Sequence, residues 1–235
     1  KKILAALRVS YRKLTDGVKT FPRQASFVGD QVISSYTELC LLSQYLDLEK
    51  SEDQHFRRLE NVLKEYPIFT EFLDGVKGCG AAMSGVLISE IDIHKAKYPS
   101  SVWAYAGLDV ASDGRGRSRK AEHLIDVEYT TKDGKQDTRK SITFNPFLKT
   151  KLFVLATCFI KANSPYREAY DGYKHRLENH PDWAERTKGH RHNAAMRYML
   201  KMFLKDLYAA WRTIEGLPVS QTYQEAKLGH VHKAA

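Results

Sequence analysis

The sequence predicts a mainly α fold, with a helical, coiled-coil-like arm followed by a mostly helical domain that contains a helix-hairpin-helix-like element and one β-hairpin. Three observations support this prediction. Apolar residues recur near a 3.6-residue period over most of the chain, period-two alternation is confined to residues 124–144, and glycines gather among small apolar residues between positions 70 and 108. We therefore divide the chain into an arm (1–66), a domain (67–218) and a polar, disordered tail (219–235).

The arm is expected to form a helical hairpin. Apolar residues at helical spacing occupy residues 4–14 and again 32–46, on either side of a proline-containing break. Ser51, with Gln54 three residues later, has the pattern of a capping box and predicts the start of a third helix, which would end at Pro67. Helical arms of this kind often dimerise.

The domain should contain one pair of strands between helices. Ile125, Val127 and Tyr129 alternate with polar residues before a Lys-Asp-Gly-Lys turn at 132–135, which is typical of a β-hairpin. Helices are expected to resume with Pro146 at a first helical position, to restart near residue 164, and to end with a long helix from about residue 190 to 214.

The charge balance indicates a polyanionic partner. Lys and Arg outnumber Asp and Glu by 37 to 28, which gives a net charge of +9, and the positive residues are clustered. The three cysteines are far apart in the sequence and predict free thiols in a reducing cytosol. Because no run approaches the roughly 18 to 20 apolar residues of a membrane helix, we expect a cytoplasmic protein without membrane contact.

Residues 73–87 have the pattern of a helix, a tight Gly-x-Gly turn and a second helix of small residues. Lys77, Gly78 and Gly80 are expected to contact nucleic acid there, because glycine lets backbone N–H groups approach a phosphate at a helix N-terminus. The alternative is an ordinary helix turn in which glycine permits close packing.

A basic loop follows, and four of its six residues from 115 to 120 are Lys or Arg. Such a run repels itself unless an anion lies across it. The nucleic-acid contacts expected from this loop are Arg115, Arg117, Arg119 and Lys120, and those from a second basic patch at a helix start are Lys188, His190 and Arg191. The alternative for either patch is a solvated surface.

Two serines in or beside this loop are candidate nucleophiles. A serine hydroxyl can attack a phosphodiester when its proton is removed and arginines neutralise the developing charge. Ser118 lies between Arg117 and Arg119 and is preferred, whereas Ser112, which precedes Asp-Gly, is the alternative. The sequence identifies no general base.

These segments resemble a known family. The order Gly-Val-Lys-Gly-Cys-Gly (75–80), Ile-Ser-Glu-Ile (88–91), Trp-Ala-Tyr-Ala-Gly-Leu (103–108) and a serine-bearing basic loop is similar to the C-terminal transposase domain of the insertion-sequence one-ten family of bacterial transposases. The resemblance covers about residues 70–215, and the arm resembles the helical segment that precedes this domain. It implies a DNA recombinase with a serine nucleophile, a structured guide RNA, a homo-oligomer (dimer or tetramer) and a location at the bacterial nucleoid.

The resemblance also implies a composite active site, in which a ribonuclease-H-like domain binds Mg²⁺ beside the serine of another subunit. The sequence as given contains no such carboxylate domain, so we expect an inactive fragment and no metal ligand within it. Two features depart from the family: its compact Ser-Gly is replaced by Ser112-Asp113-Gly114 with Ser118 further on, and the hairpin resembles an insertion. Lys149 and Lys151 stand where the family has basic contacts.

Two other functions remain open at this point. The chain could be a non-catalytic nucleic-acid-binding module that uses the helix-hairpin-helix and the basic loops, or a helical interaction protein whose arm dimerises and whose basic surface is incidental.

Overall fold

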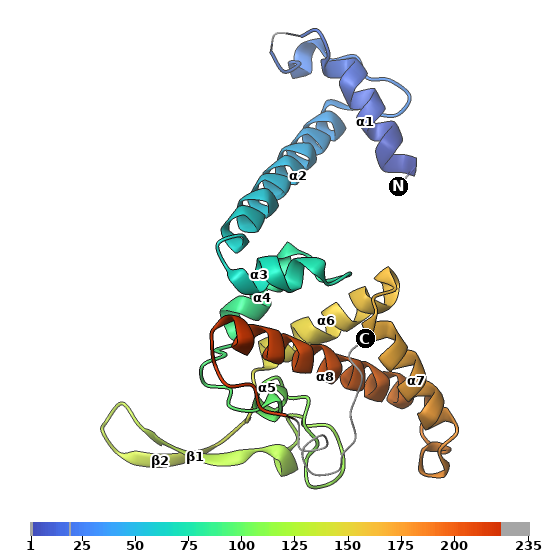
Figure 1. Ribbon diagram of the computed structural model, residues 1–235. Helices are drawn as coiled ribbons and strands as arrows, with labels where there is room; N and C mark the ends of the chain where they lie inside the picture. Colours follow the sequence, from blue (N-terminus) through green and yellow to red (C-terminus); the bar gives the residue numbers. More distant parts are fainter. Residues whose placement is uncertain (1, 19, 222–235) are drawn as a thin grey trace. The chain divides into compact units, whose positions relative to one another are not determined.

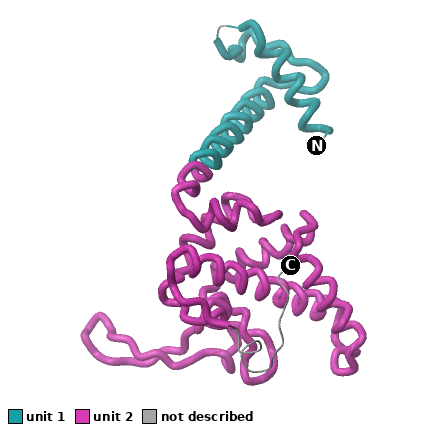
Figure 2. Tube along the Cα trace, viewed as in Figure 1, with its two compact units in different colours: residues 1–58 teal, residues 59–235 magenta. Residues whose placement is uncertain are grey.

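Figure 1 shows the computed structural model of the chain, which describes residues 2–18 and 20–221. Its described part is mainly α, with eight α-helices and one two-stranded antiparallel sheet, as predicted. The chain forms two compact units, residues 1–58 and 59–235 (Figure 2). Their boundary lies inside a helix, before the expected end of the arm at residue 66, and most of the expected tail lies outside the described residues.

Unit 1 is a helical hairpin. It contains α1 (Lys2–Thr15), a 3₁₀ turn (Gln24–Ser26) and most of α2 (Tyr36–Leu63). Ile33, Leu39 and Leu42 are buried at its centre, and α1 packs Leu7 and Leu14 against them. Burial of these apolar side chains is what holds the two short segments together.

The expected third helix is wrong, because α2 continues through Ser51 to its end. A capping box with formed hydrogen bonds lies at the start of α2 instead. The Glu38 carboxylate accepts the backbone N–H groups of Ser34 and Ser35, and the Glu38 N–H donates to Ser35 Oγ at 3.3 Å. These bonds satisfy backbone groups that a helix N-terminus leaves open, so the helix begins here and Ser51 lies exposed within it.

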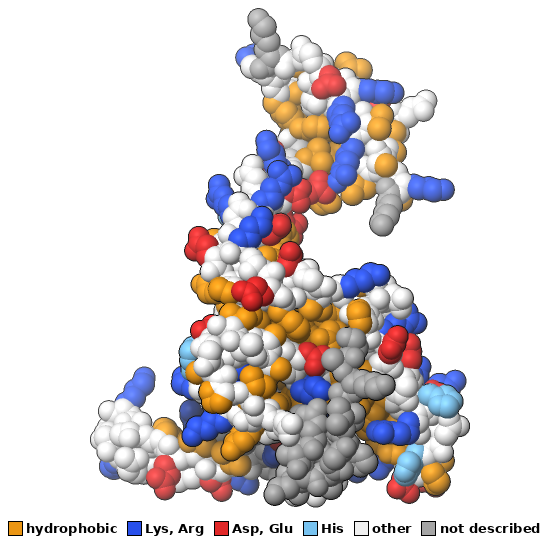
Figure 3. Space-filling model, in the orientation of Figure 1, with side chains coloured by type: hydrophobic (Ala, Val, Ile, Leu, Met, Phe, Trp, Pro, Cys, Tyr) orange, Lys and Arg blue, Asp and Glu red, His pale blue; other side chains and the backbone are white. Residues whose placement is uncertain are grey.

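Large apolar side chains also remain at the surface of unit 1. Leu41 and Leu48 of α2 are 60% and 71% exposed. Figure 3 shows hydrophobic and basic side chains together on the surface of this unit. The dimerisation expected of the arm stays a prediction.

The described part of unit 2 contains six further α-helices and two β-strands. They are α3 (Pro67–Glu71), α4 (Ala81–Glu90), α5 (Pro99–Tyr105), the hairpin strands β1 (Ile125–Thr130) and β2 (Gln136–Ser141), α6 (Pro146–Ala162), α7 (Tyr166–Glu178) and α8 (Lys188–Ile214), with short 3₁₀ turns at Leu73–Gly75, Ala121–His123 and Pro181–Trp183. The predicted Pro146 start of α6 is confirmed, and the side chain of Asn145 caps this helix by accepting the N–H of Leu148.

The core of unit 2 is built around α8. Its apolar face is buried from Ala194 to Trp211, as the spacing predicts, and Phe203 packs within this core. The Phe203 ring packs against Phe72, Phe159 and Tyr166, with ring centroids 5.1 to 6.4 Å apart. Edge-on and offset ring contacts of this kind add to the energy of burial.

The predicted hairpin is confirmed between Ile125, which pairs with Ser141, and Thr130, which pairs with Gln136. Figure 1 shows that it projects away from the helices of unit 2. Both strands are mostly exposed, so the hairpin contributes little to the core.

The helix-hairpin-helix-like element is formed by α3, the following 3₁₀ turn and α4. Gly78 has the expected positive φ of +95°, whereas Gly80 has an ordinary φ of −82°. A Cβ atom on Gly78 would lie 3.2 Å from the carbonyl oxygen of Cys158 in α6. This contact supports the close-packing interpretation of Gly78, while Lys77 and Gly80 are exposed.

Within the described residues, none of the helices has the length and apolar content needed to traverse a membrane.

Candidate functional site

The basic loop is folded back on itself after α5. Gly107 ends that helix with a φ of +65°, and a side chain there would meet the ring of Phe144 at 2.6 Å. The loop then closes through backbone hydrogen bonds from Ala111 to Arg115 (2.8 Å) and from Arg117 to Asp109 (3.1 Å). The next residue along the chain is Ser118.

Ser118 lies against a histidine and an aspartate. The distance from Ser118 Oγ to His123 Nδ1 is 2.8 Å, and that from His123 Nε2 to Asp113 Oδ2 is 3.2 Å. The 3₁₀ turn Ala121–His123 brings the imidazole against Ser118, and His123 is only 3% exposed. A serine, a histidine and a carboxylate thus follow one another at hydrogen-bond distance, as the three side chains of a catalytic triad do.

The hydrogen bonds determine which imidazole nitrogen carries the proton. The backbone N–H of Ser118 donates to His123 Nδ1 at 3.0 Å, so Nδ1 is the unprotonated nitrogen. The Ser118 hydroxyl therefore donates to Nδ1 as well, and Nε2–H donates to Asp113. In this tautomer the lone pair of Nδ1 is shared between the backbone N–H and the hydroxyl of Ser118.

Asp113 is suited to hold this tautomer. The Arg115 backbone N–H donates to its carboxylate and is the main cause that lowers its pKa, and the hydrogen bond from His123 lowers that pKa further. Asp113 is therefore ionised at neutral pH, and an anion at this position would stabilise a protonated His123.

The two candidate serines differ in this structure. Ser118 is partly exposed and bonded to His123, whereas Ser112 is exposed and makes no side-chain hydrogen bond within the described residues. Of the two serines, only Ser118 has a histidine within hydrogen-bond distance, and its role as the nucleophile stays a prediction.

A group of cations surrounds the same loop. Arg117 donates to Asp109 Oδ2 from both Nε (3.0 Å) and Nη2 (2.7 Å). Lys149 of α6 donates to the Arg117 carbonyl, and its ammonium lies 4.7 Å from the centre of the Phe144 ring. Arg197 of α8 faces the loop from another element, because a Cβ on Gly116 would lie 2.5 Å from its Nη1.

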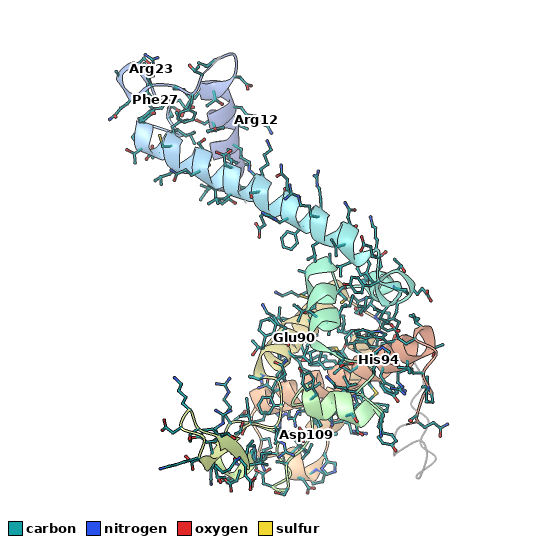
Figure 4. The ribbon with its side chains drawn as sticks, turned by 90° about the vertical axis from the view of Figure 1, so that its left-hand side faces the viewer. Arg12, Arg23, Phe27, Glu90, His94 and Asp109 are labelled. Carbon is teal, nitrogen blue, oxygen red and sulfur yellow. The ribbon has the colours of Figure 1, made fainter. Side chains whose placement is uncertain are left out.

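Partial burial acts on these cations. It is the main cause that lowers the pKa of Lys149 and of Lys201, and repulsion from Arg197 lowers both further. Burial likewise lowers the pKa of Arg197, while Asp109 acts in the opposite direction on all three. Several positive charges therefore share one carboxylate (Asp109 is labelled in Figure 4).

The other residues expected to contact nucleic acid have varied surroundings. Arg119 and Lys120 are exposed, and Arg115 is exposed with its Nε 4.0 Å from Asp113. The ammonium of Lys151 lies 5.3 Å from the centre of the Phe147 ring.

The second basic patch lies at the start of α8. Arg191 is engaged there by the carbonyl oxygens of Trp183 and Arg186. His190 bonds the capping Thr187 at 3.0 Å, and Lys188 is exposed. Within the described residues, no hydrogen bond or ion pair joins this patch to the loop that carries Ser118.

Sequence reasoning missed His123, Asp109, Arg197 and Lys201. His123 follows Ser118 by a spacing that no regular element brings together, and a 3₁₀ turn does so here. Arg197 and Lys201 were missed because the sequence of α8 was interpreted only for its apolar periodicity. Their four-residue separation, which places them on one helix face, was the signal that could have identified them.

One trio of side chains has the composition of a metal site. Ligand atoms of Asp113, Glu122 and His123 lie within 4.8 Å of one another. Asp113 and His123 are already bonded to each other, however, and Glu122 is exposed. We assign no metal to this trio.

Comparisons of the chain with protein-family models, with curated proteins and with solved structures gave no match.

Proposed function

We propose that this chain is the DNA-joining part of a transposase-type recombinase, in which Ser118 attacks a DNA phosphodiester and His123 accepts the serine proton. One observation carries the proposal: the Ser118 hydroxyl is 2.8 Å from the unprotonated nitrogen of a histidine that Asp113 orients. Among the described residues, this serine combines a base, an ionised partner for the base and a strongly basic neighbourhood.

The chemistry conserves the energy of the phosphodiester. As the bond between Ser118 Oγ and phosphorus forms, the bond from phosphorus to the leaving deoxyribose oxygen breaks. The serine proton passes to His123 Nδ1, and the leaving oxygen takes it up as its hydroxyl forms. A second DNA hydroxyl can then attack the phosphoserine and release Ser118, so strands are exchanged without an external energy source.

The surrounding charge supports a nucleic-acid substrate, and its identification as DNA rests on the family resemblance. The chain has a net charge of +9, and Arg117, Lys149 and Arg197 lie at the loop that carries the serine. Cations stabilise the extra negative charge of a phosphorus centre under attack. The guide RNA, the oligomer and the Mg²⁺-binding carboxylate domain are part of the same proposal and rest on the family resemblance alone.

A fluorophosphonate reagent tests the serine in the chain as it stands, because it labels activated serines and needs no second domain. We expect mass spectrometry to find the label on Ser118, Ser118→Ala to abolish it, and Ser112→Ala, the matched control in the same loop, to retain it. Labelling that persists in Ser118→Ala at the wild-type rate would contradict the assignment.

A DNA experiment tests the substrate. When the chain, supplied with the carboxylate domain and guide RNA, is trapped with nicked DNA and digested, the nucleotide should be found on Ser118. An adduct on another residue would refute the role of Ser118.

A non-catalytic nucleic-acid-binding module is the second candidate, and one observation favours it. Arg117 is already bound by Asp109, and the bonds from Ser118 to His123 also serve to hold the loop in shape. This function predicts DNA binding that weakens steeply with salt, without serine labelling. The fluorophosphonate experiment separates the two functions.

A further inference from the structure

We propose that Lys149, Arg197 and Lys201, together with Arg117, form a subsite for one phosphate group, and that Asp109 occupies the place of this phosphate until it binds. The inference deepens the proposed function, on which it rests for the identification of the phosphate as part of a DNA strand. The shared chemistry is a tetrahedral phosphate oxyanion, whether it belongs to DNA or to free inorganic phosphate.

The first argument is the arrangement of the cations. Arg197 and Lys201 are four residues apart on α8, where side chains at this spacing lie on one face. Arg197 contacts the loop at Gly116, and Lys149 reaches the same loop from α6 through the Arg117 carbonyl. Two helices and the loop thus direct positive groups toward one region of unit 2.

The second argument is the lack of compensation. Within the described part of the chain, Lys149, Arg197 and Lys201 form no salt bridge with any carboxylate. The Lys201 ammonium lies 5.2 Å from the centre of the Trp103 ring, and Asp109 raises the pKa of Lys201 without forming a salt bridge with it. Half-buried charges are unfavourable without a counter-ion, so an anion that binds among these three groups relieves their repulsion.

The third argument concerns Asp109. Its Oδ2 accepts both hydrogen bonds from Arg117, while its Oδ1 is buried without any hydrogen-bond partner. A guanidinium that forms paired bonds with a carboxylate forms the same kind of bonds with a phosphate. Asp109 is therefore placed as an internal competitor, and an incoming phosphate would take over its electrostatic role toward the cations.

The experiment measures binding to the chain by two probes: inorganic phosphate, by ³¹P NMR line broadening, and a short duplex DNA, by fluorescence anisotropy across a salt series. Arg197→Gln and Lys201→Gln should each weaken binding about tenfold or more, as expected for the loss of a charge-assisted contact. Lys161→Gln is the matched control, since it removes the same charge from an exposed position on α6. Arg197→Lys should restore part of the affinity.

Asp109→Asn gives the opposite expectation, because it removes the competing carboxylate and should tighten phosphate binding. A variant that merely disturbed the fold would not bind more tightly, so this sign separates the subsite from a structural role. If Asp109→Asn stays folded by circular dichroism and does not tighten binding of either probe, the role of Asp109 is overturned.

The outcomes also distinguish the source of the phosphate. Weakened binding of DNA, with a salt slope reduced by about 0.9 for each lost phosphate contact, supports a DNA subsite. Weakened binding of inorganic phosphate alone overturns the DNA source and leaves a free-anion site, and unchanged binding of both probes overturns the subsite itself. Failure of the subsite and failure of the nucleophile give different results, because fluorophosphonate labelling of Ser118 tests the nucleophile, whereas phosphate and DNA binding by the Arg197 and Lys201 variants test the subsite.

Discussion

Replacement of His123 by alanine tests whether the imidazole both shapes the loop and activates the serine. The variant loses three hydrogen bonds: those from the Ser118 backbone N–H and hydroxyl, and the one from the imidazole to Asp113. At about 0.5–1.5 kcal/mol for each bond, we expect the free energy of unfolding to fall by about 1.5–4.5 kcal/mol. His94→Ala is the control, because that side chain is 63% exposed and should change stability little.

The effect on reactivity should be larger. Removal of a general base costs about 100- to 10,000-fold in rate, or about 3–5 kcal/mol of transition-state stabilisation at roughly 1.4 kcal/mol for each tenfold step. The rate of fluorophosphonate labelling of Ser118 should therefore fall by this factor in His123→Ala. Equilibrium unfolding in urea, measured on the same samples, separates this loss from a loss of folded protein.

A second variant sharpens the test. His123→Gln places a carbonyl oxygen near the Ser118 donors without supplying a base of suitable pKa. It should regain part of the stability but none of the labelling rate. A folded His123→Ala protein whose labelling rate stays within tenfold of wild type would show that His123 is a structural ligand of the loop, and the proposed chemistry would be wrong.

Three further predictions concern the fold. Phe203→Ala should lower the free energy of unfolding, measured in urea titrations, by about 3–5 kcal/mol, because the ring is fully buried among other aromatic rings. Leu41→Ala, at an exposed position, is the control and should change it by less than about 1 kcal/mol. A change that small in Phe203→Ala would contradict the placement of this core. Burial raises the pKa of Cys79 to about 11, so maleimide at neutral pH should label it only after denaturation, and rapid labelling of native protein would show that the thiol is accessible. Hydrogen bonds from the Ile33 N–H, the Ser10 hydroxyl and the Val32 N–H lower the pKa of Asp30 below its ordinary 3.8. The stability that these bonds give unit 1 is present above pH 3.8 and is lost as the pH falls through the lower pKa of the folded state. Asp30→Asn should therefore flatten the acid unfolding profile measured by circular dichroism, and an unchanged profile would argue against these bonds.

Local signals in the sequence predicted the elements that depend on local chemistry. The N1 proline of α6 and the turn of the β-hairpin are confirmed, because each feature fixes its own backbone conformation. The capping box at Ser51 failed because its Ser-x-x-Gln pattern lies within a continuing helix, whereas Ser35 and Glu38, which also fit the pattern, stand at a real N-terminus.

The candidate site was predictable only in part. Ser118 could be singled out from its basic neighbours, since that feature is visible in the sequence. Its contact with His123 depends on a short 3₁₀ turn, and the approach of Arg197 depends on how α8 packs beside the loop. Neither arrangement leaves a periodic pattern, so the base and the additional cations required the three-dimensional structure.

The projecting hairpin has a consequence for solubility of the folded chain. Within the described residues, β1 and β2 pair only with each other, so their outer backbone edges are open to a strand from another molecule. Charged side chains stand at Asp126, Glu128, Arg139 and Lys140, and the first pairs across the hairpin with the last. An added strand would have to bury or displace these charges, so the charged side chains that keep the hairpin hydrated also disfavour its edge-to-edge aggregation.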